Sequence, residues 1–134
     1  MNIKLMVIAH GDLGRAFLRT AEDISGRRDG IFVREVNRSD GIDKIKRELD
    51  RFCQKLSENE GLLILADMLG GTPSNVCIPL IRSGNVEVIT GINFPMLVTA
   101  IHKKDRVKNL EELAEIVSRA GKEGVVICSK RVDK

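Results

Sequence analysis

Two polar residues directly follow apolar runs of this chain. His10 closes the run Ile3–Ala9, and Asp67 follows Gly61–Ala66. Such runs predict buried parallel strands, and open α/β sheets build their sites at the carboxyl ends of those strands. A carboxylate bonded to one imidazole nitrogen fixes the tautomer and leaves the other nitrogen's lone pair free to attack an electrophile. His10 and Asp67 are therefore a candidate nucleophile and its orienting partner.

A glycine-rich turn after Asp67 adds a second kind of chemistry. Gly70, Gly71 and Thr72 precede Pro73, and threonine before proline is typical of an N-cap followed by the first helical position. A turn that opens a helix directs backbone N–H groups and a hydroxyl towards an anion, and the helix dipole adds to the attraction. A nucleophile beside an anion cradle favours phosphoryl transfer.

Each of these residues also has a purely structural interpretation. A histidine at the end of a strand often bonds a local backbone group, and Asp67 alone is suited to accept backbone hydrogen bonds in its own turn. Gly70, Gly71 and Thr72 match ordinary turn and cap chemistry. Their joint placement at predicted strand ends keeps the functional interpretation open beside the structural one.

The second histidine and a group of arginines are interpreted as surface residues. His102 lies in the charged stretch 101–106, which predicts an exposed helix end or loop. Arginines near the first predicted helix would guide an acidic partner to His10, but a solvated helix face is the favoured interpretation. These arginines are Arg15, Arg19, Arg27 and Arg28.

The composition is that of a soluble globular protein with an aliphatic core. The chain has 134 residues, of which 43% are hydrophobic, 31% charged and only 3% aromatic. This length suits one domain over residues 1–134. The formal net charge is +3, but the charges alternate in sign along the predicted helices, and no aromatic platform for bases is present. The sequence therefore argues against nucleic-acid binding.

Several other kinds of site lack their sequence signals. The chain contains neither the phosphate-binding loop of nucleotide hydrolases nor the glycine fingerprint of dinucleotide-binding folds. Cys53, Cys77 and Cys128 form no Cys-x-x-Cys pair, so we interpret them as reduced core thiols and expect no metal. There is no signal-peptide pattern and no apolar run of the ~18–20 residues that a membrane span needs, so we expect a cytoplasmic protein.

Strands that alternate with helices would position these residues. The periodicity predicts a doubly covered, mostly parallel sheet, that is, a three-layer α/β/α fold with right-handed crossovers. Ser39 and Asp40 are candidate caps of the second helix. The expected strands are 3–10, 30–36, 61–66, 86–91 and 124–128, and the expected helices are 13–24, 42–56, 72–83, a short one opened by Pro95, and 110–120.

Pro79 conflicts with a regular third helix. A proline inside a helix removes a backbone hydrogen bond and crowds the carbonyl four residues earlier. We therefore expect a kink at Pro79 or an early end of that helix, with Gly84 as the stop.

Four segments together resemble the mannose-type IIA component of the bacterial phosphoenolpyruvate-dependent sugar phosphotransferase system, of the mannose, fructose and sorbose family. They are Ala9–Gly11, Thr20–Glu22, Asp67–Asn75 and Gly91–Leu97. They occur in the family's order and spacing and span almost the whole chain. Pro79 is a departure from the family pattern, although it leaves every motif residue in place.

The resemblance implies roles for particular residues. His10 would be phosphorylated by the histidine-containing phosphocarrier protein (HPr) and would pass the group to a IIB component of the permease for sugar uptake. Asp67 would orient His10, while Thr72 and the amides of Gly71 and Thr72 would bind the phosphoryl group. The chain would then be a phosphotransferase component with a phosphohistidine intermediate and no metal or organic cofactor.

The resemblance also implies an assembly. In the family the sheet carries one antiparallel edge strand, here the C-terminal one, whose exchange forms a homodimer. Contact with the membrane would be indirect, through the permease. Because no IIB domain is present in these 134 residues, one alternative stays open: a regulatory phosphoprotein in which the phosphorylation state of His10 controls binding to a target protein. The sequence does not name the sugar.

Overall fold

The expected alternation of strands and helices is present in the computed structural model of the chain, which describes residues 1–68 and 70–132. Periods of two and of 3.6 residues in the sequence correspond to these elements. In chain order they are β1 (Asn2–His10), α1 (Leu13–Ser25), β2 (Ile31–Val36), α2 (Ile42–Gln54), β3 (Glu60–Ala66), α3 (Thr72–Cys77), the 3₁₀ helix η1 (Ile78–Ser83), β4 (Val86–Ile89), α4 (Phe94–Lys103), α5 (Leu110–Glu123) and α6 (Cys128–Val132).

The four strands form one parallel sheet in the order β2-β1-β3-β4. Ile8 of β1 is level with Ala66 of β3, and His10 is level with Val36 of β2. From the β1–β3 pair the chain builds outward in both directions, so the strand order reverses between these two strands. In open α/β sheets this reversal opens a crevice at the carboxyl ends, and His10 ends one of the two strands that form it.

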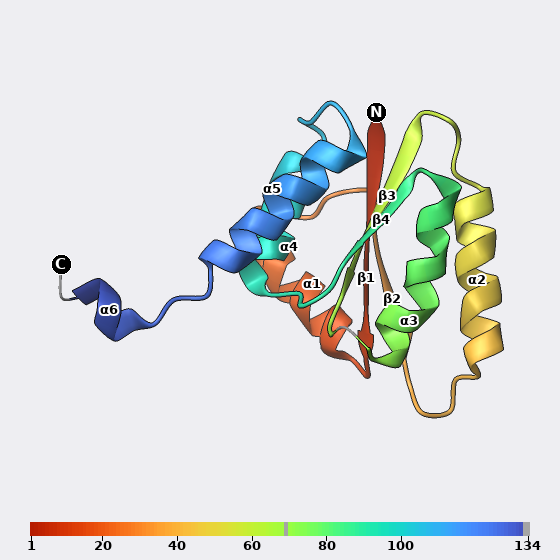
Figure 1. Cartoon of the computed structure of the whole chain (residues 1–134), viewed down its shortest axis with the longest axis horizontal. Coiled ribbons are helices and arrows are strands. Elements are labelled where there is room, and N and C mark those ends of the chain that lie inside the picture. Colours follow the sequence, from red (N-terminus) through yellow and green to blue (C-terminus); the bar gives the residue numbers. More distant parts are fainter. Residues whose placement is uncertain (69, 133–134) are drawn as a thin grey trace.

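Helices cover both faces of the sheet, so the structure has the three layers predicted from the sequence. In Figure 1, α1, α4 and α5 lie on one side of the strands, and α2 and α3 lie on the other. Side chains of a strand alternate between faces. Leu5 and Val7 of β1 therefore join the first core cluster, whereas Met6 and Ile8 join the second.

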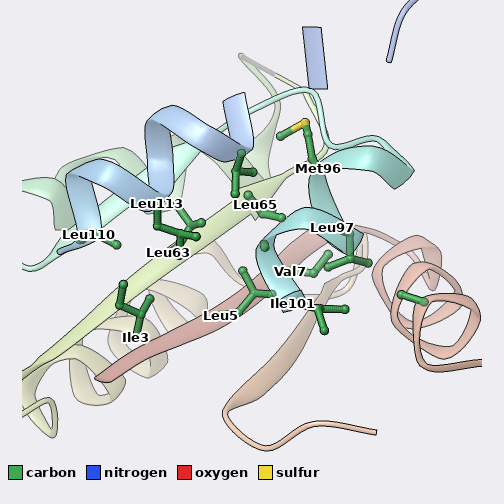
Figure 2. Packing of buried hydrophobic residues seen from close by; sticks show 13 residues of the cluster. Ile3, Leu5, Val7, Leu63, Leu65, Met96, Leu97, Ile101, Leu110 and Leu113 are labelled. Atoms are coloured by element: carbon green, nitrogen blue, oxygen red, sulfur yellow. The ribbon is translucent and has the colours of Figure 1, made fainter. Parts of the chain in front are cut away.

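The larger core is built from aliphatic side chains of β1 and β3 and from the helices above them. Figure 2 shows Leu63 and Leu65 of β3 in one cluster with Leu113 of α5 and Leu97 of α4. Each of these four side chains is fully excluded from solvent. Burying a leucine side chain contributes roughly 1.5–3 kcal/mol, so this layer fixes the position of β3 and of the residue that follows it.

Pro79 has the effect that its position predicts. The α-helix α3 ends at Cys77, and the chain continues as η1, which holds Pro79 in its first turn. Proline cannot donate the bond to the carbonyl four residues earlier, so the tighter helix replaces the α-helix at this point. The segment ends at Ser83, before Gly84, as expected.

The predicted C-terminal strand at 124–128 is not formed in this structure. Residues 125–127 have no regular structure, α6 begins at Cys128, and this end of the chain extends away from the sheet in Figure 1. The sheet is therefore entirely parallel in the described residues, without the antiparallel edge strand. A strand forms only where its backbone groups pair with a neighbouring strand. Residues 125–127 lie beside no other strand of the described chain, which is the physical reason why the predicted strand is absent.

Three further expectations are corrected by the structure. Helix α2 is capped by Gly41 rather than by the side chain of Ser39 or Asp40, and α3 is capped by Gly71 rather than Thr72. Cys128 is exposed, so it is not a core thiol, although Cys77 is buried. No helix in the described part of the chain is long and apolar enough to cross a membrane.

Candidate functional site

His10 and Asp67 meet at the carboxyl ends of β1 and β3. His10 Nδ1 lies 2.6 Å from Asp67 Oδ2, and the backbone N–H of His10 donates to the same oxygen at 3.0 Å. The imidazole is half exposed, at 52%, whereas the carboxylate is 11% exposed. A ring nitrogen bonded to a carboxylate carries the proton, so Nε2 keeps its lone pair and is the nitrogen free to react.

Asp67 is held as a carboxylate by its surroundings. Burial raises its pKa, but hydrogen bonds from the His10 N–H, the His10 ring and the Met68 N–H outweigh burial and lower the pKa below its ordinary value of 3.8. Met68 N–H donates to Asp67 Oδ1 at 2.8 Å, so both carboxylate oxygens have a donor. The negative charge that orients His10 is thus present at neutral pH.

The backbone of Asp67 is fixed by the turn after β4. Gly91 N–H donates to the carbonyl of Asp67, and Ile92 N–H donates to that of Ala66, both at 3.1 Å. β4 itself ends at Ile89, two residues before the end at Gly91 that the sequence suggested. The segment that opens α4 therefore holds the end of β3 in place.

Gly71 lies against the imidazole of His10. A Cβ at Gly71 would be 3.0 Å from His10 Cε1, 3.3 Å from Met68 Cγ and 3.7 Å from His10 Nε2. This is closer than side-chain carbons ordinarily approach, so the glycine lets the start of α3 approach the free ring nitrogen. The structure thus brings Gly71, His10 and Asp67 together, as the sequence predicted.

Ser74 organises the turn before α3, and sequence reasoning missed it. Its buried hydroxyl accepts from Gly70 N–H and donates to the Gly71 carbonyl, both at 3.1 Å. The sequence signal for this role was a serine directly after Thr72-Pro73, since serine hydroxyls bond nearby backbone groups. In the described residues the Thr72 side chain makes no such bond, so its hydroxyl is available to a ligand.

A cavity of about 470 Å³ opens beside His10. His10, Gly11 and Thr72 line one part of it, and residues from the end of β2 to the start of α2 line another, among them Arg38. Sequence reasoning did not single out Arg38. His10 and Thr72 line the same cavity, so an anion held there would lie beside both residues.

The other singled-out residues lie elsewhere or are already paired. His102 is exposed and lines a hollow with Arg28, Lys103 and Arg106, near the end of α4, and it does not line the cavity beside His10. Arg15 is 70% exposed and pairs with Glu35 at 2.8 Å. The surface interpretation of these residues fits their exposure. In the stretch 101–106, however, Ile101 and Lys104 are buried.

The chain is similar to several known proteins. A family model described as the fructose IIA component of the phosphotransferase system (PTS) matches residues 4–118. The mannose-specific EIIAB component of the PTS from Escherichia coli strain K12 is 31% identical over 140 residues, which cover 100% of this chain and 42% of that protein. The chain therefore spans less than half the length of this relative.

A relative from another organism is closer to this chain in length. The PTS fructose-specific EIIA component of Bacillus subtilis strain 168 is 21% identical over 133 residues, which cover 98% of this chain and 90% of that protein.

Solved structures share the fold over almost the whole chain. The phosphotransferase system component EIIA from Streptococcus agalactiae superposes with a TM-score of 0.87 at 26% identity, over 96% of this chain and 98% of that one. The mannose/sorbose-specific IIA subunit from Enterococcus faecalis gives a TM-score of 0.84, also at 26% identity, over 95% of both chains.

Proposed function

We propose that this chain, which belongs to the mannose- and fructose-type IIA family of the sugar phosphotransferase system, carries a phosphoryl group on Nε2 of His10. The observation that supports this most directly is the 2.6 Å contact between His10 Nδ1 and Asp67 Oδ2. It fixes a half-exposed ring whose residue lines a cavity. A pre-oriented nucleophile of this kind needs only a correctly placed phosphoryl donor.

The proposed donor is phosphorylated HPr. The Nε2 lone pair of His10 attacks the phosphorus, a new P–N bond forms, and the P–N bond of the donor breaks with its electron pair returning to the donor's imidazole. Each ring keeps its own proton, so no proton is exchanged. Because one phosphohistidine replaces another, the step is nearly balanced in free energy, and positioning supplies most of the acceleration.

Asp67, Gly71 and Thr72 have supporting roles in this proposal. Attack through Nε2 gives the ring positive charge, which the Asp67 carboxylate stabilises at 2.6 Å. In this proposal the backbone N–H groups of Gly71 and Thr72 and the Thr72 hydroxyl, which bonds no other described residue, receive the phosphoryl oxygens. The contact between Gly71 and His10 Cε1 supports this arrangement, since it brings the start of α3 next to the reacting nitrogen.

The proposed acceptor is a IIB component, which then phosphorylates a sugar during uptake. The E. coli relative is named as an EIIAB component, which supports a IIB partner for this chain. We propose that residues 1–134 act as one IIA domain in the cytoplasm and meet the membrane only through the permease. We also propose a homodimer formed by exchange of the C-terminal segment. None of the comparisons supports the regulatory alternative.

A phosphoryl-relay assay tests the proposal. Phosphoenolpyruvate, enzyme I and HPr, with labelled phosphate, are expected to transfer label to this protein in an acid-labile, base-stable form. His10→Ala should abolish labelling because it removes the nucleophile. His102→Ala is the matched control, since it removes the only other histidine and should leave labelling unchanged. Labelling that persisted in His10→Ala would disprove the assignment.

The fate of the label separates transport from regulation. In the proposed relay, labelled protein loses its phosphate on addition of a IIB partner, and sugar phosphate appears once the permease is present. A phosphoprotein that kept its label with every IIB partner tested, and bound another protein in only one phosphorylation state, would support the regulatory alternative instead.

A further inference from the structure

Arg38 lines the cavity beside His10 and has no established role. It is the only Arg or Lys among the described residues that line this cavity. His10 lines the same cavity, so Arg38 and the imidazole that would carry the phosphoryl group border one space. A phosphoryl group carries a charge of about −2. It would add this charge to a site where the Asp67 carboxylate already contacts the ring. A cation on the cavity wall would offset the resulting repulsion.

The loop that carries Arg38 is held as a turn. Asp40 N–H donates to the Asn37 carbonyl at 3.0 Å, and Asn37 N–H donates to Asp40 Oδ2 at 2.8 Å. These two bonds close the turn on both sides of Arg38. The turn is also tied to the catalytic edge, because Gly11 N–H donates to the carbonyl of Val36 at 2.9 Å. The backbone of Arg38 is therefore fixed relative to His10.

Arg34 connects the turn to α2 through two carboxylates. Its Nε donates to Glu48 Oε2 at 2.8 Å, and its guanidinium lies 3.6 Å from Asp40 Oδ2. Asp40 is the one acid that lines the cavity among the described residues, and its carboxylate is already shared between Arg34 and the Asn37 N–H. Asp40 is thus occupied in the turn and does not neutralise Arg38.

Arg38 differs from the other arginines near this edge in having no acidic partner in the described structure. Arg15 pairs with Glu35 at 2.8 Å, and Arg34 pairs with Glu48. The Arg38 side chain is exposed and forms neither an ion pair nor a hydrogen bond within the described residues. A guanidinium presents a planar fork of donors that matches phosphoryl oxygens. An unpaired arginine on a fixed turn is suited to an anion that arrives from outside.

We propose that Arg38 is a phosphoryl-binding residue whose guanidinium pairs with the phosphoryl group during transfer and while it resides on His10. The proposal rests on the proposed function. It adds a charged side chain to the Gly71 and Thr72 groups, of which Thr72 lines the same cavity. The two sets of donors would then hold the phosphoryl oxygens between them, with Asp67 acting only on the ring.

Single-turnover transfer from phosphorylated HPr to the full chain tests this role. Arg38→Ala is expected to slow transfer at saturating donor by about tenfold or more, because it removes a charge-assisted hydrogen bond. Arg38→Lys should recover part of the rate, since it restores the charge without the fork. Arg51→Ala removes the same charge from the last turn of α2 and should transfer at the wild-type rate.

A second measurement reports on direct contact. A neighbouring guanidinium favours the doubly charged phosphoryl group, so ³¹P NMR should show that the phosphoryl group of Arg38→Ala phosphoprotein titrates at higher pH than in wild type. Arg15→Ala should leave this titration unchanged. An unchanged rate or an unchanged ³¹P titration in Arg38→Ala would overturn the proposal, even if wild type is labelled normally on His10. Absence of labelling in wild type would instead refute the proposed function.

Discussion

Asp67 connects three groups at one point of the site. Its carboxylate accepts from the N–H and the ring of His10 through Oδ2 and from the N–H of Met68 through Oδ1. The ring of His10 is consequently fixed to the strand end by two bonds to one oxygen. An orienting role and a backbone-capping role, which were alternatives for Asp67 in the sequence, are combined in this geometry.

Asp67→Asn should therefore slow phosphoryl transfer without unfolding the protein. The amide can accept from His10 through its oxygen, but its NH₂ group then faces the Met68 N–H, and the charge that stabilises the phosphorylated ring is lost. A hydrogen bond to a charged group contributes about 1.5–3 kcal/mol, so transfer should fall about 10- to 100-fold. Single-turnover rates check this, with circular dichroism as the control for folding. Wild-type rates would exclude Asp67 from the mechanism.

The same carboxylate should make stability depend on acid pH. The pKa of Asp67 is lower in the folded protein than its ordinary value of 3.8, so ionised Asp67 stabilises the fold above that pH. This contribution is lost as the pH falls through the folded-state pKa. Urea unfolding from neutral pH to pH ~3 should show the difference between wild type and Asp67→Asn shrinking on acidification. A difference that stayed constant would contradict the assignment.

Some residues of the site could be predicted from the sequence and others could not, and the difference has a physical reason. His10, Asp67 and Gly71 were predictable because they follow apolar runs or open a helix, and parallel strands bring their carboxyl ends together. Ser74 and Arg38 were not singled out because local turn bonds determine where they lie. Such bonds leave no periodic pattern, and a loop arginine looks like any solvated charge.

At the scale of elements, α4 and α5 pack closely because of glycine. A Cβ at Gly121 would be 2.5 Å from Met96 Cγ, and one at Gly124 would be 2.7 Å from Pro95 Cγ. Asn93 joins the two helices further: its Oδ1 accepts from Met96 N–H to cap α4, and its Nδ2 donates to the Gly121 carbonyl. The segment 91–97 thus links the backbone of Asp67 to α5.

Gly121→Val should destabilise the protein by forcing these helices apart. The added side chain overlaps the buried Met96, and overpacking of a core contact costs about 1–3 kcal/mol. Glu115→Val is the matched control, because it places the same side chain on an exposed position of α5 and should change stability by no more than about 0.5 kcal/mol. Chemical denaturation measures both. Equal stabilities of the two variants would show that the contact relaxes freely.

Element types were more predictable than element ends. Long periodic segments such as α1 and α5 match their predicted ranges closely, since an apolar stripe repeats over several turns. The predicted start of α2 at residue 42 was correct, but the predicted cap was wrong, because Asp40 bonds Asn37 N–H instead of capping the helix. The same side-chain chemistry serves a cap or a turn, and only the fold decides between them.

For the whole molecule, the order of strands could not be read from the sequence. Alternating strands and helices predict a parallel sheet, but the same pattern allows several orders. The observed β2-β1-β3-β4 order puts β1 beside β3, and this adjacency brings His10 to Asp67 across 57 positions of sequence. The C-terminal strand was mispredicted for a related reason, since a strand needs a neighbouring strand, and residues 125–127 pair with none among the described residues.

The proposed homodimer gives that segment a partner, and this is testable. Val125 and Ile127 are 78% and 63% exposed, and alternate residues of an extended segment share one face. Light scattering should therefore show a dimer for wild type, because exchange buries this face against a second copy. The double variant Val125→Asp/Ile127→Asp should be monomeric, since burying its unpaired carboxylates is unfavourable. Ser129→Asp/Arg131→Asp, which adds the same side chains in α6, should remain dimeric. A monomeric wild type would refute the homodimer, and a dimeric Val125→Asp/Ile127→Asp variant would show that the subunits meet elsewhere.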